Sequence, residues 1–348
     1  MPTSLYADAF NKIHGKLHLE IDEAEALLHS IVNQELTEAQ IAGLLVGLAS
    51  KGESVSEVVG FARGMRKHGV RLNHKKANLM DTAGTGGDAS GTFNISTCAA
   101  FVIAGAGIPV AKHGNRAMSS RCGSADVLHQ LGVNLAAPVL AMERCLEDCG
   151  IAFLFAPIFH PAMKAVAKVR GELRIRTIFN LLGPLLNPAG ARRQIVGVFA
   201  PRLTEMLAEV LLQLGCESAM IVSSEDGLDE ISTGAPTMVT EIHRGTCRSY
   251  SMTPEDVGLA PQPKIALVGG DIECNARIVR QILEGQERGA QLDAVLLNAA
   301  AGIYVAGHAE SLSEGLSLAH HSIESGQALQ KLDDLVVHSN LQVAVHRP

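Results

Sequence analysis

The sequence predicts an α/β protein with a small helical domain and a larger α/β domain whose mainly parallel central sheet is flanked by helices. Helical segments fill the first seventy residues, whereas from about residue 79 short β-like runs alternate with helical runs. Aromatic residues make up only 3% of the chain and Trp is absent, so the core must consist mainly of Ala, Val, Ile and Leu. With 348 residues, of which 47% are apolar, the chain can form more than one globular domain.

Two helices near the N-terminus are predicted by their start signals. Thr37 with Gln40, and Ser54 with Glu57, have the spacing of capping boxes, in which each side chain bonds the backbone of the other residue. The first of these helices is expected to end at Gly52, because glycine accepts the left-handed conformation that closes many helices.

Strand-like runs follow at intervals and are separated by helical ones. They read NLMDTA, IPVAKHG, RQIVGVFA, SAMIVSS, TMVTEIHRGT and PKIALVGG, and the chain closes with two long helical segments, LDAVLLNAAAGIYVAG and SLSEGLSLAHHSIESGQALQKLDDLVV. A parallel strand must return to its starting edge through a crossover, and a helix usually supplies it. The alternation therefore predicts a mainly parallel sheet.

A helical and basic piece, bounded by prolines, interrupts this alternation and is interpreted as returning to the helical domain. The predicted helical domain, which we also expect to form a dimer surface, comprises residues 1–72 and about 157–188. The predicted α/β domain comprises residues 73–156 and about 189–348.

Charge and cysteine usage narrow the class of protein. The net charge of −7 and the absence of long Lys/Arg runs argue against a nucleic-acid-binding protein. The seven cysteines include no CxxC pair, which suits small core residues in a reducing cytoplasm, although Cys145 and Cys149 are one helical turn apart and could bind a metal. We expect neither a signal peptide nor a membrane span, since the longest apolar run, 99–111, is too short to cross a bilayer.

A glycine-rich stretch, DTAGTGGDASGTFNIST at residues 81–97, precedes an apolar helical run expected from about Thr97. Glycines let the backbone amides approach a ligand, and a helix start favours an anion, so phosphate is the expected ligand. The stretch lacks the Gly-Lys-Ser/Thr of a Walker A loop. It matches GxGxxA, but no acidic residue follows about twenty positions on, which disfavours a dinucleotide site. A plain turn remains the alternative for GTGG alone.

Two further clusters accompany this stretch. The segment AKHGNRAMSSRCGSADVL, residues 111–128, places Lys, His, Asn, Arg and three Ser after a predicted strand, where ligands of α/β sheets bind. The segment SSEDGLDEIS brings Asp226, Asp229 and Glu230 together, as either a solvated acidic loop or a Mg²⁺ site beside phosphate oxygens. Arg170 could offer its planar guanidinium to a carboxylate if it faces the same cleft.

Together with HPAMKAVAKVRGELRIRTIFNLLGPLLNP, these three clusters closely resemble the anthranilate phosphoribosyltransferase family. The likeness runs nearly end to end, through MTPEDVGL, GGDIECNARIVRQIL and LNAAAGIYVAGHAESLSEGLSLA. The resemblance implies a hinged two-domain fold and a cytoplasmic homodimer. It also implies transfer of phosphoribose from phosphoribosyl pyrophosphate to the amine of anthranilate in tryptophan biosynthesis, assisted by Mg²⁺. Association with an anthranilate synthase is left open.

The resemblance also assigns the ligand-binding residues. For phosphoribosyl pyrophosphate they are Gly84, Gly87, Asp88, Thr92, Asn94, Ile95, Ser96, Thr97, Lys112, His113, Gly114, Asn115, Arg116, Ala117, Met118, Ser119, Ser120 and Ser124. For anthranilate they are Gly84, Asn115 and Arg170, and for two Mg²⁺ ions they are Ser96, Asp229 and Glu230. No residue is expected to act as an obligatory general base, because an aromatic amine is already unprotonated at neutral pH.

Two departures from the family pattern bear on these assignments. Met163 replaces an aromatic or polar side chain on the path to the anthranilate site, and Ser223–Ser224 replaces a more usual His–Gly before the acidic loop.

Three alternative functions remain: a pyrimidine nucleoside phosphorylase-like transferase, a non-catalytic nucleic-acid-binding relative and a nicotinamide-dependent oxidoreductase. A phosphorylase of this kind usually has an added C-terminal domain. A nucleic-acid-binding relative would need a basic surface, and an oxidoreductase would need a dinucleotide site.

Overall fold

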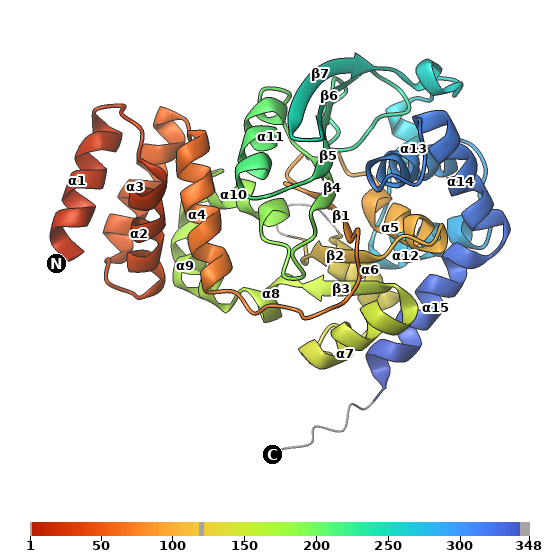
Figure 1. Cartoon of the computed structure of the whole chain (residues 1–348), viewed down its shortest axis with the longest axis horizontal. Helices are drawn as coiled ribbons and strands as arrows, with labels where there is room; N and C mark the ends of the chain where they lie inside the picture. The colour runs from red at the N-terminus through yellow and green to blue at the C-terminus, as the bar shows by residue number, and fades with distance from the viewer. Residues whose placement is uncertain (1, 89, 118–121, 342–348) are drawn as a thin grey trace.

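The computed structural model describes residues 2–88, 90–117 and 122–341. A bundle of helices forms one end of the molecule, at the left of Figure 1. Its helices are α1 (Pro2–His14), α2 (Ile21–Val32), α3 (Glu38–Lys51), α4 (Val55–Lys67), α9 (Lys164–Leu173) and α10 (Phe179–Leu182). Both predicted capping boxes are confirmed, since the side chains of Thr37 and Ser54 accept hydrogen bonds from the backbone of Gln40 and Glu57. Gly52 closes α3 with φ of 87°.

A seven-stranded sheet forms the centre of the rest of the molecule. Its strand order is β3-β2-β1-β4-β5-β6-β7. The strands are β1 (Met80–Gly84), β2 (Val110–Gly114), β3 (Ile151–Phe155), β4 (Arg193–Gly197), β5 (Ser218–Ser224), β6 (Thr237–His243) and β7 (Thr246–Met252). Strands β1 to β5 pair with one another in parallel, whereas the β5–β6 and β6–β7 pairs are antiparallel. The predicted mainly parallel sheet is therefore confirmed.

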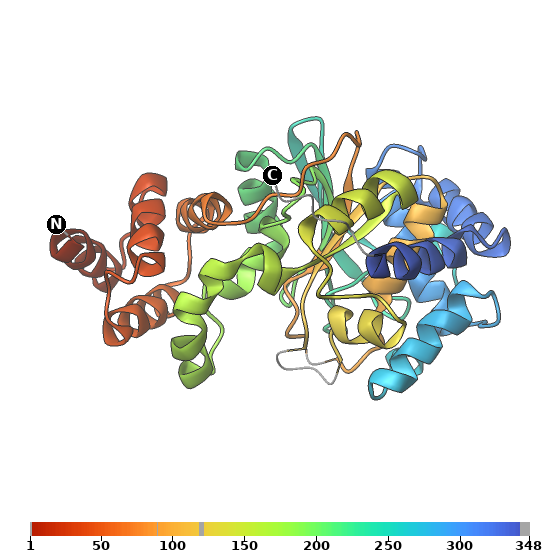
Figure 2. The same ribbon diagram turned by 90° about the horizontal axis from the view of Figure 1, so that it is seen from below.

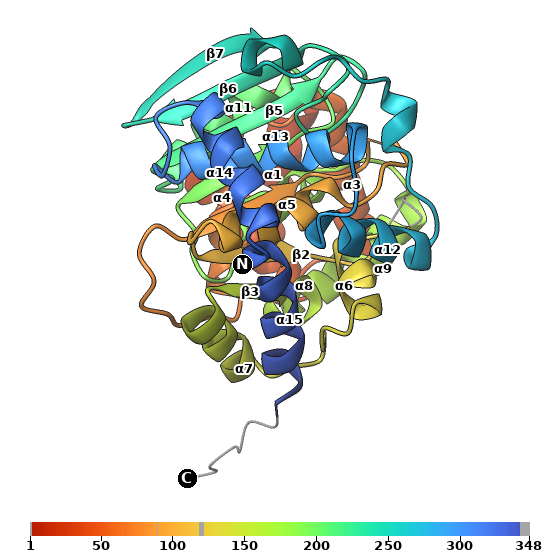
Figure 3. The same cartoon turned by 90° about the vertical axis from the view of Figure 1, so that its right-hand side faces the viewer.

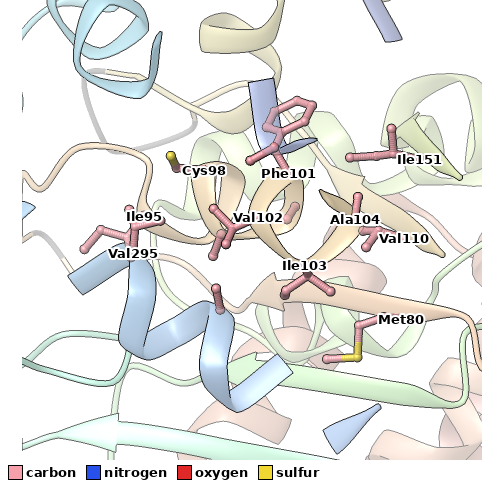
Figure 4. Close-up of a cluster of buried hydrophobic side chains, with 14 of the residues drawn as sticks. Met80, Ile95, Cys98, Phe101, Val102, Ile103, Ala104, Val110, Ile151 and Val295 are labelled. Atoms are coloured by element: carbon pink, nitrogen blue, oxygen red, sulfur yellow. The ribbon is translucent and has the colours of Figure 1, made fainter. Parts of the chain in front are cut away.

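Helices cover both faces of the sheet, as Figures 2 and 3 show from two sides. One face packs against α5 (Ile95–Gly105), α13 (Ala290–Val305) and α15 (Gln327–Asn340). Helices α14 (Leu312–Glu324) and α12 (Ile272–Leu283) pack on these helices. The other packs against α11 (Leu203–Gln213). In Figure 4, Ile103 of α5 lies between Met80 of β1 and helix α13, which carries Val295. Helix α5, which is almost wholly apolar, is thus a core element whose N-terminus is held at the edge of the sheet.

The two hydrophobic cores meet at the sheet. Successive residues of a strand point to opposite faces, so Ile195 belongs to the core around α5 and Val196 to the core around α11. The second core is continuous with that of the helical bundle, which includes Phe61 and Phe179. The helical bundle is therefore anchored on the sheet through α11, while the domain boundaries given above remain a prediction.

Shorter helices complete the chain, and several lie in the loops that lead to or from strands. They are α6 (Ser124–Gln130), α7 (Val139–Arg144), the π-helix η1 (Cys145–Cys149), α8 (Ala156–Phe159) and the 3₁₀ helices η2 (Pro161–Met163), η3 (Gly183–Leu185), η4 (Pro254–Val257) and η5 (Lys264–Leu267). Cys145 and Cys149 are both buried in this π-turn. Within the described residues, no helix is long and apolar enough to cross a membrane.

The structure differs from the sequence-based expectations in four places. The segment PKIALVGG forms η5 rather than a strand, because only Leu267 is buried, whereas Ile265 is 75% exposed. The last long helix divides into α14 and α15 at Gly326, which has φ of 74°. Strands β3 and β7 are additional to the predicted runs, and helix α5 begins at Ile95 rather than at about Thr97.

The chain crosses between the helical bundle and the sheet along three adjacent segments, which are residues 68–79, 156–163 and 183–192 in order along the chain. The Val70 N–H donates to the Phe159 carbonyl at 2.8 Å, and the Leu72 N–H donates to the Pro188 carbonyl at 3.1 Å. The ring of His160 lies against Gly69, where an added Cβ would be 3.3 Å from His160 Nδ1. These contacts tie the three crossings together next to the ends of the central strands.

Candidate functional site

The polar clusters predicted from the sequence meet at one edge of the sheet. Parallel strands β1, β2, β4 and β5 end there, at Gly84, Gly114, Gly197 and Ser224. The carboxyl edge of a parallel sheet is where α/β proteins bind their ligands. The loops that follow these four strands therefore form the candidate site.

The glycine-rich loop leaves β1 with its backbone exposed. Gly86 and Gly87 have φ of 63° and 80°, in the left-handed region that glycine accepts without strain. The Thr85 N–H is used within the fold, donating to the Gly197 carbonyl at 2.8 Å. The Gly86 N–H instead faces the acidic loop and donates to Asp229 Oδ2 at 3.0 Å.

The acidic loop after β5 reaches both ends of the glycine-rich segment. Asp229 contacts Gly86, and Glu230 Oε1 accepts a hydrogen bond from the Ser96 N–H in the first turn of α5 at 3.1 Å. Both carboxylates are acceptors at positions where backbone amides could otherwise bind an anion. The structure thus brings together two of the three clusters that the sequence analysis assigned to one site, the glycine-rich stretch and the acidic loop.

The two carboxyl groups of this loop are held in an environment that disfavours charge. Burial, followed by the charge of Asp88, raises the pKa of Asp229. Burial, followed by the charge of Asp229, raises the pKa of Glu230. A divalent cation between them would offset both effects, because it favours the ionised form of each carboxyl group.

The donor set fits Mg²⁺ better than a softer metal. Asp229 and Glu230 provide carboxylate oxygens, and Ser96 Oγ lies nearby, within 3.5 Å of Lys112 Nζ. In the part of the chain that the structure describes, nowhere do three His, Cys, Asp or Glu side chains gather as a closed metal site would require. Mg²⁺ usually keeps several waters and binds through one or two carboxylates together with substrate phosphates, and this loop can supply such a set.

Lys112 lies between these groups, in the middle of β2, and is only 4% exposed. Its Nζ donates to the Thr82 carbonyl and, at 3.2 Å, to Thr82 Oγ1. Burial lowers the pKa of Lys112, whereas the charges of Asp81 and Glu230 raise it. The amine is therefore fixed by Thr82 of β1, lies near Ser96 in the first turn of α5 and faces the acidic loop.

A fully buried carboxyl group, Asp81 of β1, supports the neighbouring strand ends. It accepts hydrogen bonds from the His113 N–H at 3.1 Å and from Asn187 Nδ2 at 2.7 Å. Asn187 also donates to the Ala111 carbonyl at 2.8 Å. Burial raises the pKa of Asp81 to about 6, and the charge of Lys112 opposes this shift. Asp81 and Asn187 thus fix β1 and β2 to the third crossing segment.

His113 is held as a neutral imidazole. Burial lowers its pKa to about 4, and its Nδ1 lies 3.0 Å from the Gly183 carbonyl. A carbonyl can only accept, so Nδ1 carries the proton. The ring also contacts His160 edge to face, with centroids 5.0 Å apart. His113 therefore shapes a wall of the site between β2 and the crossing segments.

The loop after β2 is organised around Asp126. Its carboxylate binds Arg116 Nη1 at 2.8 Å and accepts from the Ala117 N–H at 3.0 Å. Asn115 is exposed, and its carbonyl accepts from Ser124 Oγ at 3.3 Å. Gly114 lies directly against this serine, since an added Cβ would be 2.4 Å from Ser124 Oγ. Met118, Ser119 and Ser120 lie outside the described residues.

Residues 92–97 lead into helix α5 with mixed exposure. Thr92 is partly exposed and its Oγ1 lies 3.1 Å from Ser90 Oγ, while Ile95 and Thr97 are buried. Asn94 occupies the N-cap position, and its Nδ2 donates to the Cys122 carbonyl at 3.3 Å. Asp88 accepts from the Ser90 N–H at 3.2 Å. Only the partly exposed residues of this segment offer side chains to a ligand.

Arg170 is not in direct contact with the glycine-rich loop. Its guanidinium lies over the Phe179 ring, 5.5 Å from the centroid, and within the described residues no hydrogen bond joins it to Gly84 or Asn115. Met163 packs against the helical core. Ser224, by contrast, takes part in the site's framework, because its Oγ donates to the Glu230 carbonyl at 2.6 Å.

Arg176 is a site residue that sequence reasoning missed. Its guanidinium stacks over Phe199, 3.9 Å from the ring centroid, and its Nη2 donates to the Gly87 carbonyl. The only sequence signal was its place in RTIFN, six residues after Arg170. Arg176 carries a permanent positive charge from the segment between α9 and α10 to the glycine-rich loop.

Comparison with known proteins agrees with this geometry. Residues 76–329 match the glycosyl transferase family a/b domain, and residues 8–69 match the helical bundle domain of the same family. An anthranilate phosphoribosyltransferase from Thermomicrobium roseum is 53% identical over 326 residues, which cover 92% of this chain and 93% of that protein. The chain belongs to the anthranilate phosphoribosyltransferase family.

Solved structures of this family share the fold. The enzyme from Thermus thermophilus superposes with a TM-score of 0.91 at 45% identity, covering 96% of this chain and 100% of that one. Anthranilate phosphoribosyltransferase from Saccharomyces cerevisiae, solved in complex with PRPP and Mg, gives a TM-score of 0.89 at 26% identity and covers 97% and 98% of the two chains.

Proposed function

We propose that this chain transfers the 5-phosphoribosyl group from phosphoribosyl pyrophosphate to the amine of anthranilate and releases pyrophosphate, a step of tryptophan biosynthesis. The observation that carries the proposal is the meeting of two contacts at one sheet edge, Asp229 with Gly86 and Glu230 with Ser96. A polyanionic leaving group needs exposed amides, cations and carboxylates for Mg²⁺ at one place, and this edge has all three.

The diphosphate would bind where the glycine-rich loop meets the start of α5. The N–H groups of Gly86 and Ser96 point to this place and now donate to carboxylates, which would instead face the metal. Bound Mg²⁺ would neutralise charge on the departing diphosphate. We propose two ions, held by Asp229, Glu230 and Ser96. Lys112 and Arg176 would add positive charge from opposite sides of the loop.

The bond between the ribosyl carbon and the diphosphate oxygen breaks, and the anthranilate nitrogen forms a bond to the same carbon and then releases a proton. Positioning and charge stabilisation can account for this reaction without an obligatory base. His113 holds its proton on Nδ1 toward Gly183 and orients the wall of the site. Gly84, Asn115 and Arg170 would bind anthranilate, with Arg170 approaching as the helical bundle closes toward the sheet.

The remaining residues of the proposed substrate site follow the loops described above. They are Gly87, Asp88, Thr92, Asn94, Ile95 and Thr97 in the first loop and residues 113–120 with Ser124 in the second. We propose that residues 1–72 and about 157–188 form a helical domain that moves relative to residues 73–156 and about 189–348. The three adjacent crossing segments supply a hinge for this movement.

We further propose a cytoplasmic homodimer formed through the helical bundle. Tyr6 and Phe10 stack along α1 with ring centroids 5.7 Å apart, and Phe10 is 36% exposed. Val46 of α3 is 39% exposed, and the two helices contact each other. A second copy would bury this apolar surface. Sedimentation of the wild-type chain and of Val46→Glu tests this proposal. The wild-type chain should sediment as a dimer, and the substitution should weaken the dimer.

Anthranilate fluorescence tests the proposed activity. The purified chain is mixed with anthranilate, phosphoribosyl pyrophosphate and Mg²⁺, and the fluorescence should decay as product forms. Omission of phosphoribosyl pyrophosphate is the control for photobleaching. Absence of decay, together with phosphate-dependent cleavage of a pyrimidine nucleoside, would instead identify a nucleoside phosphorylase. Absence of decay with salt-sensitive DNA or RNA binding would identify a nucleic-acid-binding relative.

A further inference from the structure

A chain of side-chain amides connects helix α12 to both loops of the candidate site. Asn275 of α12 is 2% exposed, and its Oδ1 accepts a hydrogen bond from the Gly270 N–H at 2.8 Å. Its Nδ2 donates to Asn94 Oδ1 at 3.2 Å. Asn94 Nδ2 donates in turn to the Cys122 carbonyl at 3.3 Å. The chain therefore runs from the segment before α12, through the N-cap of α5, to the end of the loop after β2.

The direction of the hydrogen bonds along this chain is fixed by the backbone groups at its two ends. The Gly270 N–H can only donate, so the oxygen of Asn275 must face it and the NH₂ group must face Asn94. Asn94 must then turn its oxygen toward Asn275 and its NH₂ group toward Cys122. Because this last partner is a carbonyl, which can only accept, each amide has one orientation that satisfies every bond.

The backbone around this chain leaves little freedom. The Gly269 N–H donates to the Gly91 carbonyl at 2.9 Å, and the Phe93 N–H donates to the Leu267 carbonyl at 3.1 Å. A Cβ at Gly269 would lie 2.4 Å from Asn275 Oδ1 and 2.9 Å from the Phe93 backbone. Segments 267–270 and 91–93 are thus packed against each other, and Asn275 lies in the angle between them.

We propose that Asn275 is a positioning residue for phosphoribosyl pyrophosphate, acting through Asn94. It sets the orientation of the Asn94 amide and holds the loop before α5 in register with the loop that ends at Cys122. The inference rests on the proposed function, since Asn94 matters to turnover only if these two loops bind the ribosyl donor. Asn275 itself is buried and contacts no substrate.

The substitution Asn275→Asp tests the proposal with little change of shape. The introduced carboxylate can still accept from the Gly270 N–H, but it cannot donate to Asn94 Oδ1, so two acceptors face each other. We expect the KM for phosphoribosyl pyrophosphate to rise about tenfold, the effect of losing one buried hydrogen bond and leaving its acceptor unpaired. The KM for anthranilate should change by less than about twofold, within the range of an unaffected binding step.

Acidification supplies a readout that loss of stability would not give. Once the introduced carboxyl group is protonated it can donate to Asn94, so the KM of Asn275→Asp should approach the wild-type value as the pH falls from about 8 toward about 5.5, the range over which a buried carboxyl group can titrate. Asn275→Ala has no group to protonate and should show no such recovery. Gln281→Glu, which adds the same charge on the same helix outside this chain of amides, is the matched control and should resemble wild type.

A double-mutant cycle tests whether the effect passes through Asn94. In an Asn94→Ala background, Asn275→Asp should not raise the KM for phosphoribosyl pyrophosphate any further. If Asn275→Asp does not fold, Asn275→Ser takes its place in the cycle. Additive effects in the cycle would overturn the proposal, and so would an equal rise in both KM values with no recovery at low pH. Failure of the proposed function would instead appear in the wild-type chain, which would not consume anthranilate.

Discussion

The backbone of Asp229 lies directly against Gly197: a Cβ at position 197 would be 1.6 Å from the Asp229 carbonyl oxygen. Gly197 is the last residue of β4 and pairs with Gly84 of β1. The same glycine therefore borders both the glycine-rich loop and the acidic loop. The absence of a side chain here lets the carboxylate of Asp229 reach the Gly86 N–H.

Gly197→Ala should displace the acidic loop while leaving the sheet intact. A contact this short cannot be relieved by a side-chain rotation, because the opposing atoms belong to the backbone. We expect kcat/KM to fall by at least about 100-fold, comparable to removal of a major electrostatic contact. Steady-state kinetics and circular dichroism measure the two effects. Gly171→Ala, at an exposed position of α9 with ordinary helical backbone and nothing within 4 Å of an added Cβ, controls for general effects of adding a methyl group. Normal activity of Gly197→Ala would contradict the placement of Asp229.

Glu230→Gln should cripple turnover, and excess Mg²⁺ should restore it only in part. The amide keeps an acceptor for the Ser96 N–H but loses the negative charge that would hold the metal. We expect kcat to fall by about 100-fold or more, as for other losses of charge stabilisation. The rate is measured over a Mg²⁺ titration, and chelation of the metal should abolish wild-type activity. The exposed Glu225, in the same loop, supplies the control Glu225→Gln. A near-normal rate for Glu230→Gln would refute the metal assignment.

Arg170→Gln should weaken anthranilate binding and affect the chemical step less. A guanidinium binds a carboxylate through two parallel hydrogen bonds, and loss of this pair should raise the KM for anthranilate about tenfold. Initial rates at varied anthranilate concentrations measure the change. Arg174→Gln, at an exposed position of the same segment, is the control. An unchanged KM for anthranilate in Arg170→Gln would show that Arg170 binds something else.

Arg176→Gln should raise the KM for phosphoribosyl pyrophosphate. The variant loses the positive charge beside Gly87 and the stack over Phe199. Arg176→Lys restores the charge but not the planar stack, so its KM should lie between those of Arg176→Gln and wild type. We expect the full effect to be about tenfold, as for loss of a charged hydrogen bond. Equal KM values for all three proteins would exclude a role for Arg176 at the glycine-rich loop.

Acid should destabilise the fold partly through His160. Burial, followed by the charge of His113, lowers the pKa of His160 from 6.5 to about 3. Between these pH values the unfolded chain binds the proton more readily, so the free energy of unfolding falls as the pH decreases. Above about pH 6.5 the imidazole is neutral in both states, so this loss of stability is absent. Below that pH the free energy of unfolding changes by at most about 1.4 kcal/mol per pH unit through this group. His113 adds the same trend between pH 6.5 and about 4. Asp81, Asp229 and Glu230 oppose it, because burial raises the pKa of each carboxyl group and the folded chain therefore binds their protons more readily.

His160→Phe should reduce this pH dependence, because the new ring cannot be protonated. Urea unfolding at about pH 7, 6 and 5 measures the free energy of unfolding for the variant and for wild type. The difference between them should shift in favour of the variant as the pH falls. His308→Gln, at an exposed position, is the control and should follow wild type. Parallel curves for His160→Phe and wild type would mean that His160 is not kept neutral by the fold.

Much of the fold and of the candidate site follows from local patterns in the sequence. The capping pairs at Thr37 and Ser54 are read from spacing alone, and the strand ends are marked by the polar residues that follow them. Strand ends of a parallel sheet share one edge, so the meeting of the glycine-rich and acidic loops could be predicted once the strands were placed. The structure supplies the contacts, such as Glu230 with Ser96, that make the prediction concrete.

The residues that support the site could not be predicted in this way. Asn275 and Asn94 are 181 positions apart, and nothing local marks either side chain as the partner of the other. Arg176 resembles any exposed arginine until the position of Phe199 is known. The failed strand prediction at residues 263–270 has a similar cause, since that segment is shaped by its packing on residues 91–93 rather than by its own alternation.

The two outer strands of the sheet are protected from other chains in different ways. Strand β3 is buried and covered by α7 and α15, whereas β7 is mostly exposed and carries hydroxyl groups and Arg248. Exposed polar and charged side chains discourage a foreign strand from adding to a sheet edge. Neither border therefore offers a template for continuing the sheet from one molecule into the next, which protects the protein from β-type aggregation when its concentration is high.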